Sequence, residues 1–204
     1  MAEPASGSVA EAKRALRQRV LEMRASLDAR ALAEGARSLR DIMLATPELA
    51  DAQRVAGYVS VGREPGTGPL IEALSARGVE VLLPILLPDG DLEWAAYEGP
   101  RSLASATRGL LEPTGDPLGT GAVATAGAIL VPGLAVDRHG IRLGRGGGSY
   151  DRVLARVAGR AFSCVLLHDG EVLDMRVPRD SHDVPVAAAA TPSHLHRFGR
   201  SRDE

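Results

Sequence analysis

Strand-like and helix-like segments alternate along residues 54–83, and this alternation limits the fold more than any other feature of the sequence. Residues 54–61 are rich in valine and include a tyrosine, which favours a β-strand. Residues 67–77 place leucine and isoleucine at helical spacing, and Gly78 follows as a helix stop. Residues 79–83 have the composition of a second strand. A strand, a helix and a strand in succession indicate a crossover between parallel strands, so we predict an α/β domain.

Other segments of the chain extend this pattern on both sides. Helical spacing of apolar residues runs through residues 9–25, where Ser8 and Glu11 match a capping box, and through residues 28–44. We further predict strands at 79–83 (closed by Pro84), 92–97, 128–131, 162–167, 172–173 and 186–190, a helix from about 149 to 157, and mainly loop over 100–126. The expected architecture is therefore a three-layer α/β/α fold with a mostly parallel central sheet.

The size and composition of the chain suit one globular domain. It has 204 residues, of which 45% are hydrophobic and 25% charged, and it shows no internal repeat or linker. We expect a single domain over residues 9–196, between disordered tails at 1–8 and 197–204. The one cysteine, Cys164, excludes an internal disulfide and lies in an apolar run, which favours a buried, inert thiol.

Charge and hydropathy exclude several classes of partner. The net charge is −2, so bulk electrostatics suggest neither a nucleic acid nor a membrane as partner. No apolar run approaches the roughly 20 residues of a membrane span, and the first residues lack a signal-peptide core. We expect a cytoplasmic protein that is a monomer or weak dimer. Any positive charge that matters for function has to be local.

Residues 142–152 combine glycine, arginine and aspartate in one short segment. Four of the five positions 144–148 are glycine, which lets backbone N–H groups approach an anion closely. Three arginines surround these glycines, and the guanidinium group matches phosphate oxygens. Asp151 adds a carboxylate that could hold Mg²⁺. The segment therefore predicts a binding site for a metal–polyphosphate.

This loop matches neither of two common nucleotide-binding motifs. A Walker A loop requires a lysine, which the segment lacks, and Ser149 stands where a dinucleotide-binding fingerprint needs its third glycine. The chain has 23 arginines and a single lysine, Lys13, which shares a helix face with Arg17. Lys13 is either a phosphate ligand or a solvated helix residue.

Several motifs in order resemble those of the 5-formyltetrahydrofolate cyclo-ligase family, whose members are also called 5,10-methenyltetrahydrofolate synthetases. The resemblance runs from about Lys13 to Thr191. The matching segments are 13–17, 58–61 with Glu64 and Thr67, 109–113, 131–137, the arginine–glycine loop with 150–152, and 182–185. The chain departs from the family pattern at Ser149 (usually tyrosine), Val136 (phenylalanine) and Ala187 (aspartate). We expect Ser149 to change folate packing or affinity without removing the ATP site.

The resemblance implies ATP- and Mg²⁺-dependent cyclisation of 5-formyltetrahydrofolate, with or without a polyglutamate tail, to 5,10-methenyltetrahydrofolate. The implied reaction runs through a phosphorylated formyl intermediate and releases ADP and phosphate. The resemblance also implies an architecture similar to sugar-phosphate isomerases and CoA transferases. The resemblance assigns catalysis to Arg145 and Lys13. It assigns ATP binding to Lys13, Arg14, Arg17, Arg142, Leu143, Gly144, Arg145, Gly146, Gly147, Gly148, Ser149 and Tyr150. It assigns substrate binding to Val59, Glu64, Arg145, Gly146, Gly147, Gly148 and Ser149, and metal binding to Asp151 and Asp183.

Simpler roles for these residues remain open at this stage. Asp151 could cap the helix that starts near Ser149, Asp183 could form an Asx-turn before Pro185, and Glu64 could be a solvated loop charge. Two other functions also remain: a non-catalytic nucleotide or folate binder of the same fold, and a sugar-phosphate isomerase-like or CoA-transferase-like enzyme. The latter needs a carboxylate or lysine placed for proton transfer or acyl attack.

Overall fold

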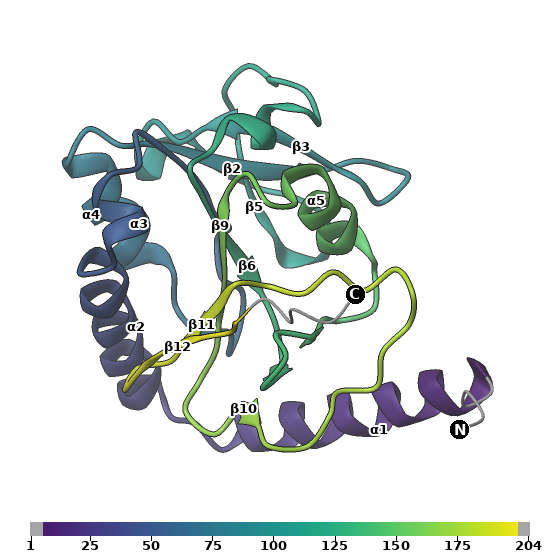
Figure 1. Ribbon diagram of the computed structural model, residues 1–204. Coiled ribbons are helices and arrows are strands. Elements are labelled where there is room, and N and C mark those ends of the chain that lie inside the picture. The colour runs from purple at the N-terminus through teal and green to yellow at the C-terminus, as the bar shows by residue number, and fades with distance from the viewer. Residues whose placement is uncertain (1–5, 200–204) are drawn as a thin grey trace.

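Seven strands form the central sheet of the protein, whose structure is a computed structural model that describes residues 6–199. The strand order is β12-β11-β9-β6-β1-β2-β3 (Figure 1). The strands are β1 Arg54–Ala56, β2 Glu80–Leu86, β3 Leu92–Ala96, β6 Ala128–Pro132, β9 Phe162–Leu166, β11 Ala188–Ala190 and β12 Leu195–Arg197. All interior pairs are parallel, and only the edge strands β3 and β12 run antiparallel. The predicted mostly parallel sheet is confirmed.

The predicted strand–helix–strand unit is present, with two changes in its boundaries. Helix α4 (Gly68–Ala76) joins β1 to the parallel β2, and Gly78 takes φ +79° after it. Strand β1 is shorter than predicted: Gly57 still donates to the Leu82 carbonyl, and residues 58–61 then leave the sheet. The prediction that Pro84 closes β2 is wrong. β1 pairs with β2 only as far as Leu82, so the missing N–H of proline breaks no ladder bond there.

Helices cover both faces of the sheet, as the three-layer prediction requires. Helices α2 (Ala29–Leu44), whose N-cap is Asp28, and α4 lie on one side, and α5 (Ser149–Val157) lies on the other (Figure 1). Within β6, Leu130 packs with the α2 and α4 side chains, whereas Ile129 packs with α5. This period of two, with both faces apolar, is typical of a parallel sheet buried between helices.

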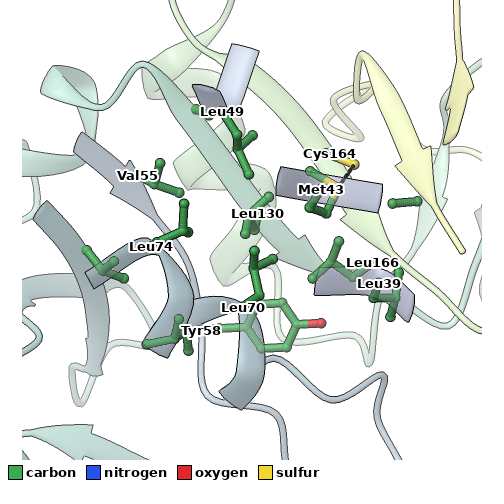
Figure 2. Packing of buried hydrophobic residues seen from close by; sticks show 14 of the residues in the cluster. Leu39, Met43, Leu49, Val55, Tyr58, Leu70, Leu74, Leu130, Cys164 and Leu166 are labelled. Atoms are coloured by element: carbon green, nitrogen blue, oxygen red, sulfur yellow. Dashed lines mark hydrogen bonds between the residues drawn. The ribbon is translucent and has the colours of Figure 1, made fainter. Parts of the chain in front are cut away.

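The core on the α2 side contains the single cysteine. Figure 2 shows Met43 and Leu39 of α2 beside Cys164 and Leu166 of β9. Burial raises the pKa of the Cys164 thiol to about 12, so the thiol stays protonated at neutral pH. These surroundings are consistent with the buried, inert thiol that the sequence predicts.

A long N-terminal helix and a second, smaller sheet complete the fold. Helix α1 (Ser6–Ala25) packs Val20 against a sheet of order β10-β7-β8, formed by Val172–Leu173, Ala135–Asp137 and Arg142–Leu143. The predicted 100–126 loop contains the hairpin β4 (Leu103–Ser105) and β5 (Leu111–Pro113), with 3₁₀ turns at Pro100–Ser102, Thr107–Gly109 and Ala122–Thr125. Helix α3 (Pro47–Ala50) is one further short turn. No helix among residues 6–199 has the length and apolar character needed to cross a membrane.

Regular elements extend into both predicted tails. Residues 1–5 and 200–204 lie outside the described residues, but residues 6–8 belong to α1 and Arg197 belongs to β12. The predicted cap at Ser8 is wrong because the helix includes it; Gly7 costs only about 1 kcal/mol in a helix and does not stop it. Arg197 pairs with Ala188 across the sheet and donates to Glu48.

The turn at Gly140 gives a test of the packing around the small sheet. Gly140 has φ +79°, and an added Cβ would collide with the Val186 carbonyl oxygen. Gly170 has φ +85° with open space where a Cβ would lie. We expect Gly140→Ala to lower the free energy of unfolding by about 2 kcal/mol more than Gly170→Ala, because only the first adds a backbone clash. Urea denaturation of both variants measures this difference; equal losses would contradict the clash.

Candidate active site

One cavity of about 570 Å³ collects nearly all of the predicted site residues. Its walls come from α1, the loop after β1, the strands β2 and β3, the β4–β5 hairpin, the arginine–glycine loop and residues 180–183. All of the predicted site residues lie in the described range, and only Arg14 does not line this cavity. The Arg14 side chain is 78% exposed and lies 3.8 Å from Glu11 on the helix surface.

The arginine–glycine loop lines the cavity and contains a run of backbone N–H groups that have no acceptor among residues 6–199. Among the hydrogen bonds of residues 6–199, the N–H groups of residues 144–150 donate none to the protein. Gly146 and Gly148 adopt φ +102° and φ +71°, which non-glycine residues rarely adopt. Gly148 is the N-cap of α5, so the positive end of that helix adds to the donors. This arrangement matches an anion-binding concavity.

Lys13 contributes a cation from helix α1. Its ammonium donates to Asp180 at 2.8 Å and to Asp183 at 2.5 Å, and its side chain is only 9% exposed. Burial lowers the pKa of Lys13, but the hydrogen bonds and charges of Asp180 and Asp183 outweigh it and raise the pKa above its usual value. Lys13 is therefore charged and buried in the site rather than a solvated helix residue.

Arg142 is the most buried cation of the cavity. It donates to Asp151 at 2.9 Å and lies 6.0 Å from the centre of the Tyr150 ring, and its buried Nε has no hydrogen-bond partner within residues 6–199. Burial lowers the pKa of Arg142, and burial likewise raises the pKa of Tyr150. Asp151 makes no helix-cap hydrogen bond, so its partner Arg142 explains its position better than capping does.

Arg145 and Glu64 join the glycine loop to the loop after β1. Arg145 donates to Glu64 at 3.1 Å, and the Val61 N–H donates to the other Glu64 oxygen at 2.9 Å. The Glu64 side chain is 9% exposed, so it is not a solvated loop charge. Ser60 and Thr67 exchange two side-chain-to-backbone hydrogen bonds that close this loop. The loop therefore holds Glu64 in the cavity.

The rest of the cavity lining is mainly apolar and comes from segments that the sequence analysis did not assign to the site. The apolar residues are Ala10, Val61, Pro84, Leu86, Leu92, Leu110, Leu111 and Pro132, and Glu112, Gly133 and His182 line the cavity as well. Tyr58 and Asp180 also line the cavity without having been predicted to do so. A cavity with cations at the loop and apolar walls elsewhere suits a ligand that combines an anionic group with flat rings.

Comparison with known proteins identifies the family. Residues 9–192 match the 5-formyltetrahydrofolate cyclo-ligase family. The chain belongs to this family. It is 42% identical to a 5-formyltetrahydrofolate cyclo-ligase of Mycolicibacterium smegmatis, over 68% of this chain and 73% of the relative. It is 32% identical to an Escherichia coli 5-formyltetrahydrofolate cyclo-ligase, over 75% of this chain and 85% of the relative.

A solved structure of similar architecture supports the same family. The NMR structure of 5,10-methenyltetrahydrofolate synthetase from Aquifex aeolicus superposes with a TM-score of 0.79. It is 28% identical in sequence and covers 94% of this chain and 96% of its own. With the cyclo-ligase relatives, this likeness shows that the chain is a ligase of folate one-carbon metabolism.

Ser149, the main departure from the cyclo-ligase pattern, has a structural partner. Its hydroxyl donates to the Gly90 carbonyl at 2.6 Å, in the turn between β2 and β3. The next residue of that turn, Asp91, accepts from Arg156 of α5 at 2.9 Å. These bonds fasten both ends of α5 to the hairpin, and Ser149 anchors the glycine loop through its side chain while its N–H has no acceptor among residues 6–199.

A buried ion pair fixes α1 beside the rest of the cyclo-ligase site. Arg24 donates to both oxygens of Glu171, at 2.7 and 2.8 Å, and both side chains are 3% exposed. Arg24 also donates to the Gly133 carbonyl, and Glu171 accepts from the His168 N–H. Helix α1 also carries Lys13, and its Arg17 donates to the Gly144 carbonyl. The Arg24–Glu171 pair therefore fixes one wall of the cavity.

Removing one member of this pair is expected to destabilise the fold strongly. Arg24→Met leaves the Glu171 charge buried without its partner, which typically costs about 3–5 kcal/mol. The matched control is Arg138→Met, which breaks an exposed pair with Asp174 and is expected to cost less than about 1 kcal/mol. Guanidinium denaturation checks both. The double variant Arg24→Met with Glu171→Met is expected to regain part of the loss, because no unpaired charge remains.

Proposed function

We propose that this protein catalyses the ATP- and Mg²⁺-dependent cyclisation of 5-formyltetrahydrofolate to 5,10-methenyltetrahydrofolate, with release of ADP and phosphate. The observation that carries this proposal is the run of residues 144–150, which lines the same cavity as Lys13 and Arg142 and whose N–H groups have no acceptor among residues 6–199. The family supports the folate substrate. The free donors and cations support a polyphosphate as its co-substrate.

The proposed reaction needs an activated formyl oxygen. Transfer of the γ-phosphoryl group to that oxygen forms a P–O bond and breaks the bond to the ADP oxygen. The N10 amine then forms a bond to the formyl carbon and loses its proton, and phosphate leaves with the former formyl oxygen. Little covalent chemistry is required of the protein, so positioning and neutralisation of charge supply most of the acceleration.

The residues of the cavity suit these two tasks. Arg145 and the loop N–H groups would bind the β- and γ-phosphates and the transferring group. Lys13 and Arg17, both on α1, would bind further phosphate oxygens. Glu64, which accepts a hydrogen bond from Arg145, and Val59 would bind the folate. The phosphoryl donor and the formyl acceptor would then meet at Arg145.

Asp151 and Asp183 fit a magnesium ion by their chemistry. Mg²⁺ usually takes one or two carboxylates together with waters and phosphate oxygens, and among residues 6–199 no cluster of three acidic, histidine or cysteine groups offers a larger cage. Asp151 and Asp183 both line the cavity, where Arg142 and Lys13 pair with them. The ion would supply charge neutralisation at the phosphates. Asp183 also accepts from the Asp180 N–H, so it shapes its own turn as well.

The other candidate functions have less support from this site. A lysine-based proton or acyl transfer would use Lys13, whose ammonium is held between two carboxylates and charged. A non-catalytic binder stays compatible with Ser149, but the hydroxyl of this residue anchors the loop and leaves the loop donors free. The cyclo-ligase reaction therefore remains the function that the geometry favours.

An absorbance assay for methenyltetrahydrofolate tests the proposal directly. We expect the purified protein to form the product from 5-formyltetrahydrofolate only when both ATP and Mg²⁺ are present. Arg145→Ala is expected to abolish turnover and leave the thermal midpoint almost unchanged, since this side chain is 57% exposed. Turnover without ATP, or folate binding with no turnover, would reject the cyclo-ligase assignment.

Neighbouring positions of α1 separate a nucleotide role from a general charge effect. Lys13→Ala is expected to raise the KM for ATP at least tenfold and the KM for folate less than twofold, because a buried phosphate ligand is lost. Arg14→Ala removes one positive charge next to it but outside the cavity, and neither KM is expected to change. Steady-state kinetics give both values. A larger effect on the folate KM would move Lys13 out of the nucleotide site.

A further inference from the structure

Tyr58 places a hydroxyl without a partner beside the cavity. The residue follows Gly57, where the chain leaves β1, and it lines the cavity next to Val59. It is 4% exposed, and its hydroxyl is fully buried with no hydrogen-bond partner among residues 6–199. In Figure 2 this oxygen lies on the side of the ring toward Leu39 and Leu166, away from Leu74. The ring thus packs against apolar core residues, whereas its hydroxyl has no hydrogen-bond partner among residues 6–199.

The groups around Tyr58 belong to the site. Its ring meets Tyr150 edge to face, with centroids 6.5 Å apart. Burial raises the pKa of Tyr58, and the nearby negative charge of Glu64 raises it further, so the hydroxyl is protonated and able to donate. A buried hydroxyl without a partner lowers stability, and phenylalanine would fill the same core space without that cost. A ligand that accepts a hydrogen bond would explain the hydroxyl.

We propose that the Tyr58 hydroxyl donates a hydrogen bond to the 4-oxo group of the folate pterin ring. This inference rests on the proposed function and deepens it. One edge of a pterin presents two neighbouring N–H donors, the 2-amino group and N3, followed by the 4-oxo acceptor. Glu64 offers only acceptors, which suit the two donors, and the protonated Tyr58 beside it offers the donor that the 4-oxo group needs. Glu64 and Tyr58 together match the two donors and the acceptor of that edge.

Tyr58→Phe is the direct test, with Tyr97→Phe as its matched control. Tyr97 packs against the same core cluster but does not line the cavity. We expect Tyr58→Phe to weaken 5-formyltetrahydrofolate binding about five- to tenfold by calorimetry. We also expect it to raise the thermal midpoint of the ligand-free protein by a few degrees, since it removes an unpaired buried hydroxyl. Tyr97→Phe should change neither the affinity nor the midpoint in this way.

A folate analogue with a 4-amino group in place of the 4-oxo group identifies the contact. If Tyr58 donates to the 4-oxo group, the preference of the wild type for the 4-oxo compound should fall about fivefold in Tyr58→Phe. An unchanged preference would overturn the proposal. So would a lower thermal midpoint with unchanged folate affinity, which is the result expected if a buried water holds the hydroxyl. Wild-type turnover in the absorbance assay is judged separately, so failure of the cyclo-ligase function is distinguishable from failure of the Tyr58 contact.

Discussion

The buried pair of Arg24 and Glu171 is the contact on which the assembly of the site depends. It joins the N-terminal helix to a segment near the far end of the chain, and it is removed from water almost completely. Removing two charges from water is favourable only when further hydrogen bonds satisfy them. Here the Gly133 carbonyl and the His168 N–H supply two such bonds, while Nη1 of Arg24 has no partner among residues 6–199. Because Gly133 itself lines the cavity, the same contact that anchors α1 also positions this part of the cavity wall.

Within the cavity, opposite charges stabilise one another before any ligand arrives. Lys13 lies between Asp180 and Asp183, and Arg142 pairs with Asp151. These cations are the proposed phosphate ligands, and two of these carboxylates are the proposed magnesium ligands. Gathering several cations around one cavity is costly when they are unpaired, so the carboxylates make the cavity possible in the folded protein. Binding of a magnesium nucleotide would then exchange partners, with the cations turning to the phosphate oxygens and the carboxylates to the metal ion.

The sequence predicted the parts of the protein that depend on local pattern. The helix that begins at Ser149 and the helix capped by Asp28 both carry apolar residues at helical spacing with a defined start. The strands β7 and β8 were missed because they have three and two residues, too few to show a period, and form only by pairing across a turn. Asp180 was missed for a related reason: its partner Lys13 is 167 positions away, and no spacing rule connects them.

Buried polar atoms without a hydrogen-bond partner lower the stability of the folded protein. Four buried side-chain atoms lack a partner in the described part of the chain: the Tyr58 hydroxyl and Nε of Arg142, whose residues line the cavity, and Nη1 of Arg24 and Nε1 of Trp94, whose residues do not. In a core, such atoms would be replaced by apolar groups at a gain in stability, because an unmade buried hydrogen bond costs more than a made one contributes. At a binding site the same atoms can become satisfied when a ligand enters, and their cost then contributes to selectivity. A compound that lacks the matching polar group would leave these atoms unpaired, as they are in the free protein.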